Sequence, residues 1–366
     1  MRITGIEMGE LIVPLRRAFT TSRRSAGEIR EIVVRLTTDD GLVGYGSAPE
    51  LPAAVIGVDE QAPVLRGDIT NAARLLLRQD DLHPAEWHRL LQVAGGVSGA
   101  RCALDVALWD VTAQGRGVPL YRLLGGARES VETDLTISLD TPGRMGEAAR
   151  DAVARGAGVL KVKLGEGGVD ADAARLRAVA DAAPGVRLRV DGNQGWTLTQ
   201  ARAFLARLPR LEVAVELIEQ PLKAANLAGL ATFAAETSVP IIADESVQGL
   251  ADLRRVLDQR AADGVNIKLV KTAGISQALD VARVAESAGL PLMVGSMLES
   301  PIGATAALAL ACGLPGVRWV DLDTPLLAAD NPVEGGLQLD GVRLSPASAL
   351  GLGITAIRGV AWLPIH

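Results

Sequence analysis

From residue 131 onward, the chain alternates short β-rich runs with longer Ala-, Leu- and Arg-rich stretches, and this alternation limits its fold more than any other feature. Eight β-rich runs occur, at residues 133–139, 158–164, 186–191, 214–219, 239–244, 264–269, 290–295 and 317–321. Strands separated by helical stretches form parallel sheets with helices outside. Eight such units favour a closed barrel, and the lack of a glycine-rich phosphate loop after the first run argues against a dinucleotide-binding fold.

The residues before this repeat have a mixed α+β pattern. Residues 29–36 predict a strand, Asp39-Asp40-Gly41 predicts a hairpin turn, and Leu42 to Tyr45 begin the return strand. Helical patterns follow at residues 70–79, 84–93 and 98–114, and the pattern becomes irregular after residue 325. We therefore expect three parts: an α+β domain at 1–127, a barrel carrying the active site at 128–325, and a segment at 326–366 that returns to the first domain.

Composition narrows the class of partner and the compartment. The formal net charge is −6 over 366 residues, so neither nucleic acid nor a membrane is expected as a partner. The two cysteines have no metal-ligand spacing and the N-terminus has no signal-peptide pattern, so we expect a cytoplasmic protein. The apolar stretch 302–314 is too short to span a bilayer and predicts a buried helix of the barrel.

Ionisable residues end five successive predicted strands, from the second to the sixth. They are Lys163, Asp191, Glu219, Asp244 and Lys268, spaced 24 to 28 residues apart. The active sites of barrels of this type lie at the carboxyl ends of the strands. We therefore expect these five side chains to converge at one mouth of the barrel.

The three carboxylates suit a metal ion. Asp191, Glu219 and Asp244 offer hard oxygen ligands, which favour Mg²⁺, with Mn²⁺ as a substitute. Each carboxylate alone could instead cap a helix or pair with a lysine. Three of them at the same level of adjacent strands favour the metal site.

The lysines suit proton transfer. Lys161 and Lys163 are two residues apart on one strand and share a face, and we expect their repulsion and burial to lower a lysine pKa. Lys268 comes from the sixth strand, opposite the second around the ring. Bases on both sides of a carbon next to a carboxylate could invert it through a metal-stabilised enediolate. The alternative is that the lysines only neutralise the carboxylates.

These motifs resemble a known family. Lys161-Val162-Lys163, Asp191-Gly192-Asn193, Glu219-Gln220-Pro221, Asp244-Glu245-Ser246 and Asn266-Ile267-Lys268 resemble the muconate-lactonizing subgroup of the enolase superfamily, and the likeness covers nearly the whole chain. The resemblance implies a (β/α)₇β TIM-type barrel with an N-terminal α+β capping domain, so no eighth outer helix is expected. It also implies an isomerase or a lyase, and family analogy favours a homo-oligomer.

One motif separates the reactions of this subgroup. The last strand ends in Asp321-Leu322-Asp323, which resembles the D-x-D motif with which dipeptide epimerases hold the α-ammonium of the substrate. Two carboxylates two residues apart share a face and suit one ammonium group. The alternative is that Asp323 caps a turn and Asp321 pairs with a lysine.

Further positions match substrate contacts of the family. Arg24 matches the arginine that reaches the glutamate side chain in Ala-Glu epimerases, and Thr136 matches a contact on the first strand. Ser296, Met297 and Leu298 follow the seventh strand, where they could line the side-chain pocket, whereas Glu299 would favour a basic side chain. Lys161 is expected to contact the substrate. These residues leave the preferred side chain open among acidic, hydrophobic and basic ones.

The leading hypothesis is therefore an Mg²⁺-dependent epimerase that inverts the C-terminal residue of an L,L-dipeptide by proton transfer between Lys163 and Lys268. The runner-up is another reaction of the same subgroup, namely o-succinylbenzoate synthase, N-succinylamino acid racemase or muconate cycloisomerase. A third hypothesis, a barrel that only binds a ligand, is disfavoured because the set of three carboxylates and three lysines is complete.

Overall fold

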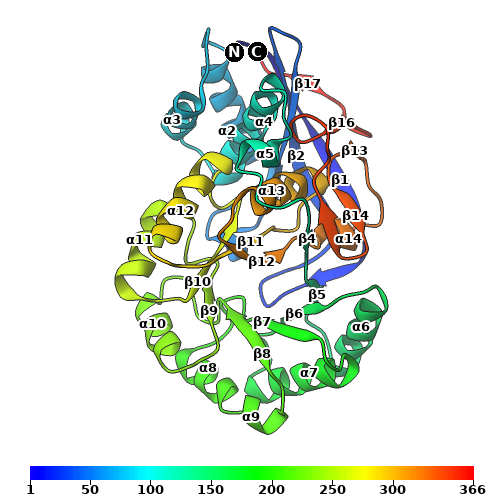
Figure 1. The fold of residues 1–366 in the computed structure, drawn as a ribbon, viewed down its shortest axis with the longest axis vertical. Helices are drawn as coiled ribbons and strands as arrows, with labels where there is room; N and C mark the ends of the chain where they lie inside the picture. Colours follow the sequence, from blue (N-terminus) through cyan, green and yellow to red (C-terminus); the bar gives the residue numbers. More distant parts are fainter.

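The computed structural model describes residues 1–366 and contains all eight predicted strands as one parallel sheet. The strands follow one another around the ring in chain order (Figure 1). They are β5 (Leu135–Ile137), β6 (Val159–Lys163), β7 (Arg187–Asp191), β8 (Val215–Glu219), β9 (Ile241–Ala243), β10 (Gly264–Lys268), β11 (Leu292–Gly295) and β12 (Val317–Asp321). The amide of Asp134 donates to the carbonyl of Val320 at 3.4 Å, so the two edges of the sheet nearly close.

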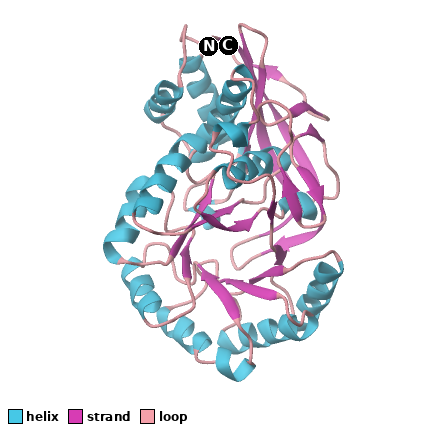
Figure 2. Ribbon diagram, in the orientation of Figure 1, coloured by secondary structure: helices cyan, strands magenta, loops and turns pink.

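Helices cover the outside of this sheet, as Figure 2 shows. One principal helix follows each of the first seven strands: α6 (Pro142–Ala154), α7 (Val169–Ala182), α8 (Leu198–Leu205), α10 (Leu227–Ala235), α11 (Leu250–Gln259), α12 (Ile275–Ser287) and α13 (Pro301–Gly313). The short α9 (Leu208–Leu211) follows α8, and only α14 (Thr324–Leu327) follows β12. The barrel is thus of the (β/α)₇β type, as predicted.

The N-terminal region forms an antiparallel sheet covered by helices. Its strands are β1 (Ile3–Thr20), β2 (Ser25–Thr38) and β3 (Val43–Pro49), and its helices are α1 (Ala53–Ile56), α2 (Ala62–Leu76), α3 (Pro84–Ala94), α4 (Ser98–Gly115) and α5 (Leu120–Leu123). Two expectations need correction. The long β1 was not predicted, and α2 begins eight residues before the predicted start at 70 because Pro63, in its first turn, favours a helix start there.

The C-terminal segment adds short strands to several parts of the molecule. These strands are β13 (Val333–Gly335), β14 (Gln338–Asp340), β15 (Arg343–Ser345), β16 (Ile354–Ile357) and β17 (Leu363–Pro364). β17 pairs with β1, and β15 pairs with β4 (Val131–Glu132). The two chain ends consequently lie side by side (Figure 1). The domain limits at residues 127 and 325 stay predictions.

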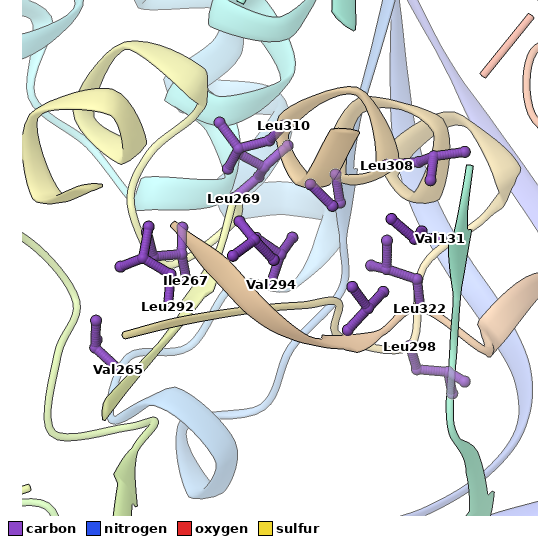
Figure 3. Packing of buried hydrophobic residues seen from close by; sticks show 14 of the residues in the cluster. Val131, Val265, Ile267, Leu269, Leu292, Val294, Leu298, Leu308, Leu310 and Leu322 are labelled. Carbon is purple, nitrogen blue, oxygen red and sulfur yellow. The ribbon is translucent and has the colours of Figure 1, made fainter. Parts of the chain in front are cut away.

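Helix α13 shows how the apolar sequence positions the site. All of its residues are buried, as the stretch 302–314 predicted, and no helix combines the length and apolarity needed to cross a bilayer. Leu308 and Leu310 of this helix belong to the same core as Val294 of β11 and Leu298, which follows that strand (Figure 3). This packing fixes the end of β11, where the site begins.

The N-terminal sheet packs on α4 through small residues. A Cβ atom on Gly46 of β3 would lie 2.0 Å from the carbonyl oxygen of Ala103 on α4. We predict that Gly46→Ala lowers the free energy of unfolding by about 1–3 kcal/mol, because backbone must move to admit the methyl group. Gly5→Ala in β1 is the control, since nothing lies within 4 Å of its Cβ position. Equal urea midpoints for the two variants would contradict this packing.

Candidate active site

The five predicted ionisable residues meet at the carboxyl ends of the strands. Lys163, Asp191 and Glu219 are paired in register across β6, β7 and β8. Asp244 directly follows β9, and Lys268 ends β10. All five are buried. Parallel register thus places them at one level of the barrel, as the spacing predicted.

A cavity of about 570 Å³, its open mouth included, lies at this end of the barrel. Barrel and capping domain both contribute to its wall. The lining residues are Phe19, Thr21, Arg23, Arg24, Val55, Thr136, Lys163, Asn193, Asp244, Glu245, Lys268, Ser296, Met297, Leu298, Asp321, Asp323 and Thr324. Ten of the thirteen predicted site residues are in this set. The other three, Lys161, Asp191 and Glu219, are buried outside the lining.

Lys161 joins carboxylates from three strands. Its Nζ lies 2.6 Å from Asp321 Oδ2, 2.7 Å from Glu219 Oε2 and 3.2 Å from Asp191 Oδ2, and its side chain is 0% exposed. The Lys161 side chain therefore exposes no surface to the cavity, where we expected it to contact the substrate. The ammonium group instead bridges the carboxylates at three strand ends.

The other two predicted lysines each pair with one carboxylate. Lys163 Nζ lies 2.7 Å from Asp191 Oδ2, and Lys268 Nζ lies 2.7 Å from Asp244 Oδ2. Burial disfavours the charged form of Lys268, but Asp244 outweighs it and raises the pKa of Lys268 above its ordinary value. The pKa of Lys161 is likewise raised, against burial, by Asp321 and Glu219. The expected lowering of a lysine pKa is wrong for Lys161, because its ammonium group faces carboxylates.

The pKa values of the three carboxylates Asp191, Asp244 and Glu219 shift in different directions. Burial disfavours their charged forms, yet Lys163 holds the pKa of Asp191 below its ordinary value, and Lys268 and Lys271 do so for Asp244. For Glu219 burial prevails and raises the pKa to about 7. Glu219 is thus the carboxylate of this group whose charge is least compensated.

The donor set fits a divalent cation in its chemistry. Four buried acceptor atoms around these residues have no hydrogen-bond partner: Asn193 Oδ1, Glu219 Oε2, Glu245 Oε2 and Asn266 Oδ1. Glu219 Oε2 lies near Lys161 Nζ but outside hydrogen-bonding geometry. No three acidic, histidine or cysteine side chains come together as a ligand cluster, because the carboxylates face lysines instead. Unpaired hard oxygens are what Mg²⁺ or Mn²⁺ would satisfy.

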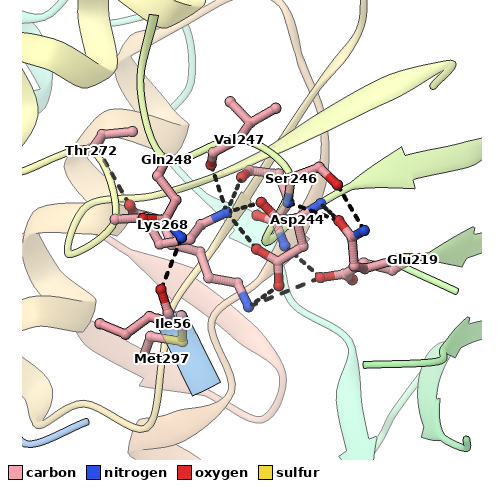
Figure 4. A network of polar contacts seen from close by, with 12 residues as sticks. Ile56, Glu219, Asp244, Ser246, Val247, Gln248, Lys268, Thr272 and Met297 are labelled. Carbon is pink, nitrogen blue, oxygen red and sulfur yellow. Dashed lines mark hydrogen bonds and ion pairs between the residues drawn. The ribbon is translucent and has the colours of Figure 1, made fainter. Parts of the chain in front are cut away.

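Sequence reasoning missed Lys271, a second lysine on Asp244. Its Nζ lies 2.5 Å from Asp244 Oδ1, 2.5 Å from the Asp244 carbonyl, and 3.2 Å and 3.1 Å from the carbonyls of Val247 and Asn266. Figure 4 shows Asp244 between its partners, with Lys268 and Glu219 beside it. A lysine inside the apolar run that follows Lys268 was the available signal, because such a charge is buried only with partners.

The two aspartates of the D-x-D motif both line the cavity. Asp321 ends β12, and Lys161 and Lys163 hold its pKa below the ordinary value despite burial. Asp323 accepts the backbone N–H of Thr136 at 2.7 Å. Burial and the neighbouring Asp321 raise the pKa of Asp323 to about 6. Asp321 is paired with Lys161, whereas Asp323 has no cation within 4 Å, which leaves its carboxylate available to a cationic group.

Another part of the cavity wall combines a guanidinium with apolar side chains. Arg24 has no carboxylate within 4 Å of its guanidinium, and burial lowers its pKa to about 10. Met297 packs with Leu51, Ile56 and Val270, while Leu298 belongs to the main core. Ser296 Oγ lies 3.4 Å from Thr324 Oγ1. Arg24 is consequently a cation without an ion-pair partner in the same cavity wall as the apolar Met297 and Leu298.

Comparison with known proteins covers almost the whole chain. Residues 6–125 match the N-terminal domain of mandelate racemase / muconate lactonizing enzyme, and residues 144–359 match the enolase C-terminal domain-like family. An L-Ala-D/L-Glu epimerase of Clostridium acetobutylicum is 38% identical over 98% of this chain and 99% of its own length.

Two solved structures have the same fold over the same span. The substrate-liganded complex of the L-Ala-D/L-Glu epimerase from Bacillus subtilis has a TM-score of 0.94 and 34% identity, covering 99% of this chain and 100% of its own. A dipeptide epimerase from Cytophaga hutchinsonii, complexed with Mg and the dipeptide D-Ala-L-Val, has a TM-score of 0.94 and 31% identity and covers 100% of both chains.

Replacing Lys271 tests whether this lysine supports Asp244. We predict that Lys271→Met lowers the free energy of unfolding by about 1–3 kcal/mol, because Asp244 and three carbonyl oxygens lose their shared donor. Lys223→Met removes an exposed lysine and should change stability by less than about 0.5 kcal/mol. A Lys271→Met urea midpoint equal to that of the control would show that Lys271 does not support Asp244.

Proposed function

We propose that this chain, which belongs to the mandelate racemase/muconate lactonizing enzyme family of the enolase superfamily, is an epimerase that inverts the C-terminal residue of a dipeptide. Its relatives are named epimerases, so the chain is an isomerase. The observation that carries the proposal is the placement of Lys163 and Lys268. They end strands on opposite sides of one barrel and line the same cavity as the D-x-D pair.

The two lysines exchange a proton at the substrate's α-carbon. In one direction, neutral Lys163 accepts the α-proton from one face, and the ammonium of Lys268 donates a proton to the opposite face. The reverse direction exchanges the two roles, and solvent exchange restores both lysines. When held by Asp191, Glu219 and Asp244, a divalent cation such as Mg²⁺, or Mn²⁺ in its place, would stabilise the negative charge that develops on the substrate carboxylate.

The acidic pair supports a dipeptide rather than an N-acylated amino acid. Asp321 and Asp323 line the cavity, and the Thr136 N–H orients Asp323. A free α-ammonium would bind between these carboxylates and offset their charge. An N-succinyl amino acid, a succinylbenzoate precursor or a muconate has no such group, and would leave the pair without a partner.

The free guanidinium of Arg24 supports an acidic C-terminal side chain. Arg24 is a partly buried cation in the cavity wall, and no carboxylate of the chain lies within 4 Å of it. A glutamate or aspartate side chain in the substrate would supply that partner through a charge-assisted, bidentate hydrogen bond. Met297 and Leu298 would contact its methylene groups.

The direct experiment is deuterium exchange. The protein is incubated with Mg²⁺ in D₂O and with pools of L,L-dipeptides, each pool sharing one C-terminal residue. We expect mass spectrometry to show one deuterium gained per dipeptide, most rapidly in the pools ending in glutamate or aspartate. Exchange only in N-succinyl amino acids, or none in any pool with metal bound, would make the dipeptide assignment wrong.

A single variant tests the acidic pair. We predict that Asp323→Asn lowers kcat/KM for dipeptides by about 10- to 100-fold, because one charge-assisted contact to the α-ammonium is lost. Calorimetric Mg²⁺ affinity should be unchanged, since Asp323 is not among the metal-binding carboxylates. The control is Asp340→Asn, which alters an exposed aspartate in β14. Wild-type kinetics for Asp323→Asn would remove the main argument for a dipeptide.

A further inference from the structure

Two buried carboxyl groups meet where the capping domain covers the end of β11. Glu299 lies in the loop between β11 and α13, and Glu31 lies on β2. Glu299 Oε1 accepts the backbone N–H of Met297 at 2.7 Å, and Glu31 Oε1 accepts that of Ser300 at 2.8 Å. The pair thus holds both sides of the loop that carries the cavity-lining Met297 and Leu298.

The fold leaves room for the Glu299 side chain. A Cβ atom on Gly303, in the first turn of α13, would lie 2.1 Å from Glu299 Oε2. Both carboxyl groups are almost fully buried, with 3% exposure for Glu299 and 1% for Glu31. A buried carboxyl group in a place shaped for it requires either a counter-charge or a proton.

No cation compensates this pair. Neither carboxyl group forms an ion pair within 4 Å. The titratable groups that face Glu299 are Glu31 on β2, Lys268 on β10, Arg24 in the β1–β2 hairpin and the thiol of Cys102 on α4. Two adjacent carboxyl groups cannot both ionise readily, so they titrate as a pair. Burial, and then the charge of Glu31, raises the pKa of Glu299 to about 8, while burial raises that of Glu31 to about 6.

We propose that Glu299 is a positioning residue that, in its protonated and uncharged form, leaves Arg24 free to bind the carboxylate of an acidic substrate side chain. The inference rests on the proposed function and adds a determinant of its specificity. Ionised Glu299 attracts the guanidinium of Arg24 and competes with the substrate carboxylate for it. Selectivity for an acidic over a neutral side chain therefore depends on the proton of Glu299.

The sign of the pH dependence follows from this competition. Below about pH 8 Glu299 keeps its proton, and Arg24 faces only the substrate carboxylate. As pH rises through this range, Glu299 becomes negative and selectivity for the acidic side chain falls. Replacing Glu31 with glutamine removes a like charge, so it lowers the pKa of Glu299 and moves the fall to lower pH.

The experiment compares alanyl-glutamate with its uncharged isostere alanyl-glutamine. The ratio of their kcat/KM values is measured from about pH 6 to about pH 9, so that Arg24, with a pKa of about 10, keeps its charge. Both dipeptides share the lysines, the cation and the α-ammonium, so the ratio cancels the titration of these groups. For the wild type we expect the ratio to fall at least about 5-fold as Glu299 ionises. It should stay flat in Glu299→Gln, in which the amide oxygen still accepts the Met297 N–H, and fall at lower pH in Glu31→Gln.

Different results would overturn the role of Glu299 and the proposed epimerase function. A flat ratio in the wild type, or an unchanged fall in Glu299→Gln, overturns the role of Glu299 while leaving the epimerase function standing. If Glu299→Gln does not fold, the profile of Glu31→Gln decides, and a fall that does not move to lower pH overturns the inference. No turnover of either dipeptide by the wild type overturns the inference and counts against the proposed function as well.

Discussion

The ion pairs between lysines and carboxylates at the carboxyl end of the barrel determine how the rest of the site is built. Four lysines (Lys161, Lys163, Lys268 and Lys271) face four carboxylates (Asp191, Glu219, Asp244 and Asp321). Charges buried this deeply persist only when they are paired and hydrogen-bonded. The same ion pairs that stabilise the site hold the pKa values of Lys161 and Lys268 above their ordinary values.

The barrel and the N-terminal capping domain contribute different residues to the cavity. Parallel register brings the ionisable strand ends to one level, so the chemistry rests on rigid elements. The β1–β2 hairpin brings Phe19, Thr21, Arg23 and Arg24 to the cavity wall. The loop after β11 completes that wall and is held from both domains, by Glu299 and by Glu31. Side-chain selectivity can consequently change in the hairpin and the loop without disturbing the proton-transfer groups.

Much of the fold was predictable because the barrel repeats one simple pattern. Each of the eight β-rich runs contains a strand, and the ionisable residues at their ends converge as the spacing predicted. β1 pairs with its neighbour β2 as a hairpin and with the distant β17, and it was not predicted because Gly5, Gly9 and Pro14, residues that strands disfavour, weaken its local pattern. The raised pKa of Lys268 and the partners of Lys271 depend on side-chain distances across strands. Spacing along the chain does not contain those distances.

In the proposed reaction, Lys163 and Lys268 act on opposite faces of one carbon. The most direct measurement is deuterium exchange into the L,L- and L,D-forms of one dipeptide by Lys163→Ala and Lys268→Ala separately. We expect complementary losses: each variant stops exchanging one epimer, still exchanges the other, and interconverts neither. Exchange of both epimers by either variant, or loss of the same epimer in both, would contradict the two-base arrangement.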